Sequence, residues 1–75
     1  MMLPSEERIE ELRREFPSGC QVELIRMLDD YAPPVGTRGI VSFVDGVGTI
    51  HVDWQTGRSL GIAYGADLCR RVDDD

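Results

Sequence analysis

Hydrophobic positions near the start of the chain recur at the spacing of a helix. Ile9, Leu12 and Phe16 share one helical face, and Ser5 ahead of them is a residue type that favours the helix N-cap. A Pro-Ser-Gly sequence follows and ends the helical pattern. The spacing predicts one amphipathic helix over residues 5–16. Its apolar stripe must be covered, either by the rest of the domain or by a second chain in a homodimer.

Beyond the helix, hydrophobic positions alternate with polar ones, which is typical of β-strands that bury one face. The alternation predicts five short strands, over residues 20–27, 39–44, 49–54, 58–64 and 69–72. In the second strand, strict alternation places Val41 and Phe43 on one face. It places Ile40, Ser42 and Val44 on the other face.

Glycine and proline residues indicate how these strands are joined. A long polar loop with Pro33 and Pro34 follows the first strand, an Asp-Gly sequence precedes the third strand, and Gly57 allows a second tight hairpin. Gly61, inside the fourth strand, indicates a bulge, a bend or a close backbone approach, and Gly65 indicates a turn. Bending at Gly61 and Gly65 would bring the last strand beside the first and cover both edges of the sheet.

Five short strands with a long first loop, two tight hairpins and a final turn follow the order of an SH3-like barrel. We therefore expect a mainly β protein, a small five-stranded SH3-like barrel preceded by one N-terminal amphipathic α-helix. The expected division of the chain is residues 1–18 for the helix and linker, 19–72 for the barrel and 73–75 for an acidic tail.

The charge balance narrows the possible partners. The formal net charge is −6 and all eight basic residues are arginines, so the chain as a whole is poorly suited to binding phosphates. Four arginines would nevertheless form a local patch for RNA or DNA if the barrel brought them together. These are Arg38, Arg58, Arg70 and Arg71. No hydrophobic run approaches the ~20 residues that span a bilayer, and the first residues lack the pattern of a secretion signal, so we expect a cytoplasmic protein with no membrane partner.

The cysteines and the single histidine do not form a metal-binding motif. Cys20 and Cys69 lie outside any Cys-X-X-Cys pattern, and zinc sites need more nitrogen and sulfur ligands at closer spacing. We expect no metal and no cofactor. The thiols are expected to pack as small apolar groups in the core, in a reducing compartment.

One set of residues has the composition of a catalytic triad. His51 and Asp53 share a strand face, and Ser42 or Ser59 is expected to lie across from them. A barrel of 75 residues has little room for a water-excluding pocket, so we expect a solvated surface pair and no enzymatic activity.

Aromatic side chains are better candidates for a binding site. Trp54 alternates with hydrophobic positions, which favours the core, although a tryptophan at a strand end also serves as a ligand platform. Tyr64 is open to the same two interpretations. Tyr31 lies in the long loop with Pro33 and Pro34, where exposure is expected. If Tyr31 and Trp54 line one groove, they would hold an extended or proline-rich protein segment; otherwise the prolines only stiffen the loop.

Three spaced motifs resemble a family of bacterial and phage-borne domains of unknown function. The motifs are P-P-x-G-T-x-G, then G-T-I-H-V-x-W-x-x-G-x-S-L-G, then Y-G-x-D, within residues 19–72. The resemblance implies the small β fold and the cellular setting, and it brings no established activity. The N-terminal helix lies outside these motifs. Independently of the resemblance, Asp67 in the last motif is expected to accept backbone N–H groups and to fix the turn.

A shorter pattern is similar to the SH3-like substrate-binding module of Mind bomb-type ubiquitin ligases. It reads G-T-x-G-x-V, then V-x-W-x-x-G, then Y-G-x-D-L. The barrel of that module binds peptides, so the resemblance implies a peptide-facing surface at Trp54, Tyr64 and Asp67. We expect a non-catalytic adaptor that binds a protein partner, or a second copy of itself, through an aromatic groove. The alternative is a nucleic-acid accessory module in phage or mobile-element biology.

Overall fold

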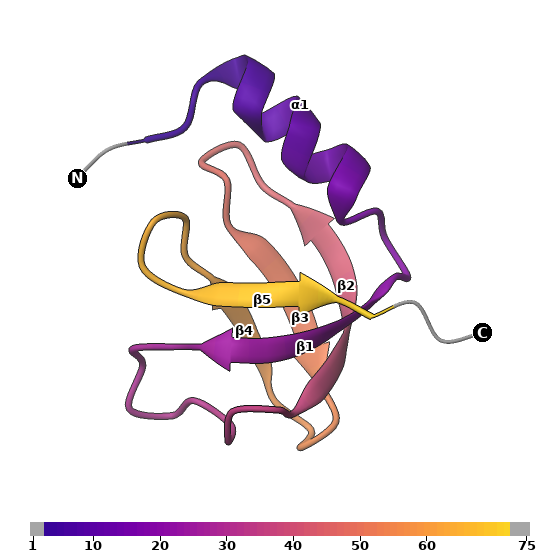
Figure 1. Ribbon diagram of the computed structural model, residues 1–75, viewed down its shortest axis with the longest axis vertical. Helices are drawn as coiled ribbons and strands as arrows, with labels where there is room; N and C mark the ends of the chain where they lie inside the picture. The colour runs from indigo at the N-terminus through magenta and orange to yellow at the C-terminus, as the bar shows by residue number, and fades with distance from the viewer. Residues whose placement is uncertain (1–2, 73–75) are drawn as a thin grey trace.

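The computed structural model describes residues 3–72 and contains one helix and five strands (Figure 1). The elements in chain order are α1 (Glu6–Glu15), β1 (Gln21–Arg26), β2 (Arg38–Val44), β3 (Ile50–Trp54), β4 (Ser59–Ile62) and β5 (Leu68–Arg71). The predicted order of elements is therefore confirmed. The predicted acidic tail, residues 73–75, lies outside the described residues.

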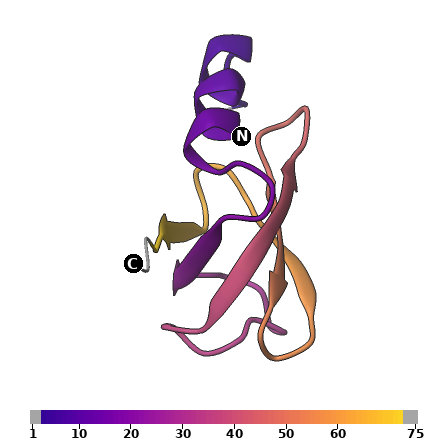
Figure 2. The same ribbon diagram turned by 90° about the vertical axis from the view of Figure 1, so that its right-hand side faces the viewer.

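The helix α1 lies across one end of the sheet (Figures 1 and 2). The Ser5 hydroxyl accepts a hydrogen bond from the backbone N–H of Arg8 at 3.1 Å, which confirms the predicted N-cap. Ile9 and Leu12 are buried, Leu12 belongs to the hydrophobic core, and Phe16 packs against that core. The apolar stripe therefore docks on the sheet of its own chain, which is the first of the two predicted arrangements.

The strands form one antiparallel sheet in the order β4-β3-β2-β1-β5. The last strand returns to pair with the first, as predicted, and Cys69 lies opposite Leu24. However, β4 and β5 do not pair, so the prediction of a closed barrel with both edges covered is wrong (Figure 2). The apolar side chains of Leu12 and Phe16 reach the core at this gap, and α1 thereby covers surface that strand closure would otherwise bury.

A β-bulge in β2 changes which side chains face the core. The register with β3 shifts between Val41 and Phe43, so the regular alternation is lost there. Val41 and Val44 are buried, whereas Phe43 is 53% exposed and stacks on His51 with ring centroids 4.3 Å apart. The prediction that Val41 and Phe43 share a face is therefore wrong.

The glycines at the two predicted turns adopt turn conformations. Gly57 and Gly65 have φ values of 92° and 81°, in the region that side chains disfavour. Gly61 marks a close approach, because a Cβ atom at this position would lie 2.5 Å from Cγ2 of Thr49. The second hairpin and the turn into β5 therefore form where the sequence predicts them.

Candidate functional site

The structure places Trp54 in the core and Tyr31 on the surface. Trp54 is only 3% exposed, and its indole Nε1 donates a hydrogen bond to the carbonyl of Leu60 at 3.1 Å. Tyr31 is 67% exposed, and the guanidinium of Arg58 lies 5.5 Å from its ring centroid. Because the indole is buried with its polar group satisfied, Trp54 has no face to offer a ligand. The predicted groove between Tyr31 and Trp54 is therefore not formed.

The two loop prolines differ in their burial. Pro33 is buried and Pro34 is exposed. The loop is held against β1, because the backbone N–H of Gly36 donates to Leu24 and the N–H of Leu24 donates to Thr37, both at 2.8 Å. This arrangement favours the interpretation in which the prolines stiffen the loop.

Asp67 fixes the turn into β5, as the sequence predicts. Its carboxylate accepts hydrogen bonds from the backbone N–H groups of Ala63 and Leu28, each at 3.0 Å. The first bond closes the turn, and the second ties it to the end of β1. Both carboxylate oxygens are used in this way, so Asp67 acts as a structural clamp at the start of β5.

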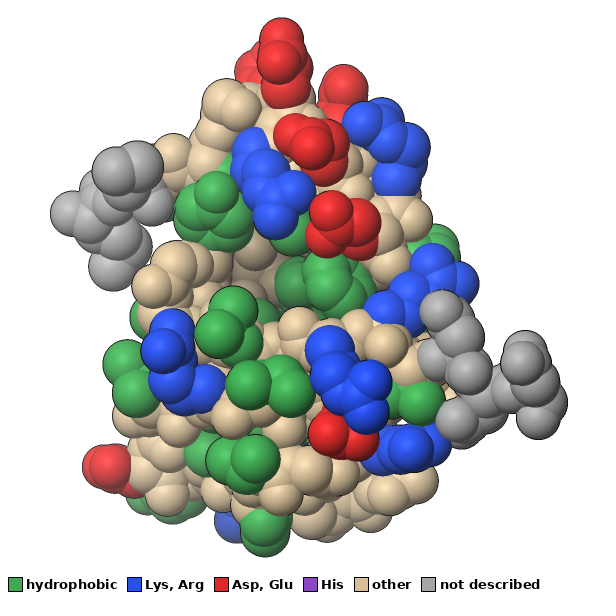
Figure 3. All heavy atoms as spheres, viewed as in Figure 1, with side chains coloured by type: hydrophobic (Ala, Val, Ile, Leu, Met, Phe, Trp, Pro, Cys, Tyr) green, Lys and Arg blue, Asp and Glu red, His purple; other side chains and the backbone are tan. Residues whose placement is uncertain are grey.

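A recess lies between α1 and β5, at the gap that the sheet leaves open. It has a volume of about 220 Å³. We call it the α1–β5 recess; its apolar lining comprises Leu12, Phe16, Ile50, Ile62, Tyr64, Leu68 and Cys69. In Figure 3 the hollow lies below the acidic side chains of α1 and above β5. Of the predicted site residues, Tyr64 and Asp67 lie at this recess.

On the side of β5, the wall of the recess is the edge of that strand that faces away from β1. The backbone N–H of Val72 donates to the carbonyl of Gln21 at 2.9 Å, so the backbone groups of Val72 point toward β1. Hydrogen-bonded and non-bonded pairs alternate along an antiparallel ladder. The Leu24–Cys69 pair is therefore a non-bonded one, and the N–H and carbonyl of Cys69 point away from β1. Cys69 is also one of the residues that line the recess.

Burial of the Cys69 thiol in this wall disfavours its thiolate form. Burial, and to a smaller extent the nearby Cys20 thiol, raises the pKa of Cys69 to about 12. The side chain therefore stays protonated at neutral pH, where attack would require a thiolate. Neither cysteine is in a disulfide and both pack against the core, which agrees with their prediction as small apolar groups.

Charged side chains form two groups on opposite sides of the recess. On the α1 side, the Arg8 guanidinium lies 3.9 Å from the carboxylate of Glu11 and 3.5 Å from that of Glu15. On the β5 side, Arg70 donates to the carboxylate of Glu23 at 3.2 Å. Acidic side chains on α1 have arginines among them, and basic and hydrophobic side chains share the face formed by β1 and β5 with an acidic side chain between them (Figure 3).

The four arginines predicted as a nucleic-acid patch are divided among different contacts. The carboxylate of Glu23 lies between Arg38 and Arg70, at 4.0 Å and 3.2 Å. Arg71 donates to the backbone carbonyl of Glu15, and Arg58 lies over Tyr31. A carboxylate between two of the arginines opposes binding to phosphates at that place.

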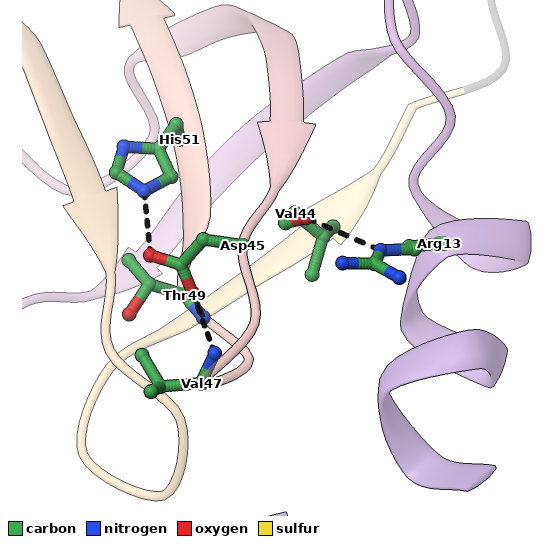
Figure 4. Close-up of polar contacts among 6 residues, drawn as sticks. All are labelled: Arg13, Val44, Asp45, Val47, Thr49 and His51. Carbon is green, nitrogen blue, oxygen red and sulfur yellow. Dashed lines mark hydrogen bonds and ion pairs between the residues drawn. The ribbon is translucent and has the colours of Figure 1, made fainter. Parts of the chain in front are cut away.

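The single histidine pairs with a different carboxylate from the one predicted. His51 Nε2 lies 2.8 Å from Asp45, in the hairpin between β2 and β3 (Figure 4). Asp53 instead accepts hydrogen bonds from the hydroxyls of Ser42 and Ser59, at 3.1 and 2.6 Å. Both serine hydroxyls bind Asp53, and His51 binds Asp45. These described residues therefore do not form the connected Ser-His-Asp arrangement that nucleophilic catalysis needs.

Asp45 makes the stability of this hairpin dependent on pH. Burial raises its pKa, but hydrogen bonds from His51 and from the backbone N–H groups of Thr49 and Val47 outweigh that effect, and the pKa of Asp45 is lowered. A lowered pKa stabilises the fold above the pKa of the unfolded chain, and this contribution is lost as the pH falls through the folded pKa. We expect Asp45→Asn to lower the free energy of unfolding by about 1–2 kcal/mol at neutral pH.

The difference in free energy of unfolding between the wild type and Asp45→Asn should shrink as the pH falls below about 4, where Asp45 of the unfolded chain takes up a proton before Asp45 of the folded protein does. Urea unfolding followed by circular dichroism between pH 7 and pH 3 measures it. Asp30→Asn, at an exposed loop position, is the matched control. A difference of constant size across this pH range would contradict the assignment.

Sequence reasoning missed two contributors to the recess. The patterns assign Leu12 to an apolar stripe and Cys69 to the core, but neither to a binding surface. Two sequence features pointed to this place: the apolar stripe of α1, which needed a surface to pack on, and the short last strand, which left an edge exposed.

Among the described residues, no group of three or more His, Cys, Asp or Glu side chains is arranged to hold a metal ion. No described helix is long and apolar enough to cross a membrane.

Comparison with known proteins identifies a family without an assigned activity. A family model described as a domain of unknown function, DUF4314, matches residues 5–72. The match includes α1, so the expectation that the helix lies outside the family region is wrong. No curated protein and no solved structure matches the chain, and the resemblance to the Mind bomb-type module stays a prediction. Since the family model covers the helix and all five strands, the chain belongs to the DUF4314 family.

Proposed function

We propose that this protein is a non-catalytic protein-interaction domain, and that an extended segment of a partner protein binds in the α1–β5 recess as an additional strand beside β5. The observation that carries the proposal is the coincidence of two features at one place. The backbone groups of Cys69 point away from β1, and an apolar recess adjoins them. Strand addition needs both, because main-chain hydrogen bonds supply affinity and pockets for alternate side chains supply specificity.

The size of the recess favours a peptide over a small molecule. Its volume of about 220 Å³ is below the range of about 300–1,000 Å³ that is usual for small-molecule pockets. A peptide strand needs less enclosed space, because only alternate side chains enter the pocket while its backbone pairs with the edge. Tyr64 and Cys69 would flank those side chains.

The proposal can be tested by selection of random 12-residue peptides displayed on phage against the folded protein. We expect enriched peptides that bind the Cys69→Ala variant and fail to bind Cys69→Pro. The two variants both lose the thiol, but only proline also removes the backbone N–H that faces the recess. Because this N–H does not pair with β1, proline is tolerated here as at other edge strands.

Circular dichroism and thermal unfolding of Cys69→Ala and Cys69→Pro establish that both are folded. If Cys69→Pro does not fold, Leu68→Asp takes its place in the comparison. Leu68 is exposed, and the aspartate would put a charge at the edge of the recess. The absence of enriched peptides, or equal binding to the alanine and proline variants, would overturn the proposed function.

A further inference from the structure

We infer that the segment bound along β5 alternates apolar and acidic side chains, with its acidic side chains on the outer face of the sheet. The inference rests on the proposed function, and it specifies the chemistry of the partner. Two observations carry it: the direction in which β5 side chains point, and the unequal distribution of charge on the two sides of the recess.

The side chains of β5 alternate between the recess and the outer face. Cys69 is opposite the buried Leu24 and packs against the core, so the neighbours of Cys69 along β5 face outward. Those neighbours are Leu68 and Arg70, and Arg70 is opposite Glu23. A strand added beside β5 continues this alternation. Its inward side chains would enter the recess, and its outward ones would lie beside Leu68 and Arg70.

The inner positions of the added strand favour uncharged side chains. They would face the apolar lining that Leu12 and Phe16 contribute from α1. Glu11 and Glu15 stand on the same helix and share the single guanidinium of Arg8. A further carboxylate entering the recess would lose its water and lie beside Glu15, which lines the recess, and this is unfavourable.

The outer face beside β5 carries more positive than negative charge. Arg70 lies 3.2 Å from the carboxylate of Glu23, and Arg26 is exposed on β1 opposite Leu68. The Nε–H of Arg26 donates to the backbone carbonyl of Ala66 at 3.1 Å, which holds the side chain near the start of β5 without neutralising its charge. The side chain of Arg70 is 57% exposed despite its bond to Glu23. Carboxylates on the outward side chains of the added strand would therefore meet a basic surface.

Exposed hydrophobic residues among these arginines favour a protein over a nucleic acid. Leu68 is 49% exposed and Ile25 is 39% exposed on the same two strands, and both would lose apolar surface to a protein partner. A phosphate backbone offers no such apolar contact, so these residues favour a protein segment. An acidic protein segment with apolar residues fits all of these groups.

The test begins with the peptides selected for the proposed function and asks for their sequences and their affinities. We expect Asp or Glu at alternate positions, separated by apolar residues. By isothermal titration calorimetry, the double variant Arg26→Glu/Arg70→Glu should bind the selected peptides at least about tenfold more weakly than the wild type. Arg58→Glu, a charge reversal at the exposed site beside Tyr31, should bind like the wild type. Raising the salt concentration should weaken wild-type binding and have little effect on the double variant.

The possible failures separate the two proposals. If peptides bind through Cys69 but are neutral or basic, or if the double variant binds as tightly as the wild type, the inference on charge is overturned and the proposed function stands. Arg26→Gln/Arg70→Gln, which avoids a carboxylate beside Glu23, replaces the double variant if the latter is unfolded. A 20-nucleotide single-stranded DNA is titrated in parallel. Salt-sensitive DNA binding that is lost in the double variant would assign this face to nucleic acid and overturn the inference.

Discussion

Replacing Trp54 with alanine is expected to lower the free energy of unfolding by about 3–5 kcal/mol, the largest effect expected of any single substitution in this protein. The indole is 3% exposed, and its Nε1 satisfies the carbonyl of Leu60, so the substitution leaves a cavity and removes a hydrogen bond. A domain of 75 residues has a total stability of about 4–11 kcal/mol. The variant should therefore be largely destabilised at room temperature.

Urea unfolding followed by far-ultraviolet circular dichroism measures this effect without depending on the fluorescence of the single tryptophan. Leu28→Ala is the matched control, because Leu28 is 73% exposed and its truncation should change the free energy by about 0.5 kcal/mol or less. The other sequence-based interpretation of Trp54 is a ligand platform. A Trp54→Ala variant with wild-type stability and lost peptide binding would restore that interpretation and contradict the assignment of Trp54 to the core.

Gly39→Ala is expected to have the second largest effect, a loss of about 1–3 kcal/mol in the free energy of unfolding. Gly39 pairs with Trp54 across β2 and β3. A Cβ atom at this position would lie 2.6 Å from Cγ1 of Val52, 2.8 Å from Cε3 of Trp54 and 2.9 Å from the backbone oxygen of Asp53. The side chains are themselves packed in the core and the backbone oxygen belongs to the ladder, so none of the three can move freely.

Gly46→Ala provides the comparison for Gly39. Neither glycine has a positive φ, and no atom lies within 4 Å of a Cβ built at Gly46. The Gly46 variant should stay within about 0.5 kcal/mol of the wild type. Thermal unfolding of both variants side by side separates a steric effect from the general effect of adding a methyl group. Equal stability of the two would show that β2 and β3 leave room for a methyl group at Gly39.

Local patterns in the sequence predicted the local structure well. The stripe of Ile9 and Leu12 forms the buried face of α1, and the spacing of glycines marks the turns that occur. Asp67 accepts backbone N–H groups at the turn, as residues of this type do. These features depend on neighbours within a few residues, which is why a pattern in the sequence can reveal them.

Features that depend on distant contacts were predicted less well. Phe43 changes face because a bulge adds one residue to β2, and a period of two cannot indicate where such a residue falls. His51 contacts Asp45 across the hairpin, although Asp53 is closer to it in sequence. β4 and β5 do not pair, and residues of α1 line the recess between them; strand patterns alone do not specify this arrangement. The recess follows from this arrangement, so it was not predicted.

The most direct test of binding beside β5 is hydrogen exchange of the Cys69 backbone amide, measured by NMR on the ¹⁵N-labelled protein with and without a selected peptide. This amide points away from β1 in the free protein. We expect saturating peptide to slow its exchange at least about tenfold, because the amide gains a hydrogen bond to the added strand, with the largest chemical-shift changes at Leu68, Cys69 and Tyr64. Unchanged exchange at Cys69, with the largest shifts at Tyr31 and Arg58 instead, would contradict strand addition at β5.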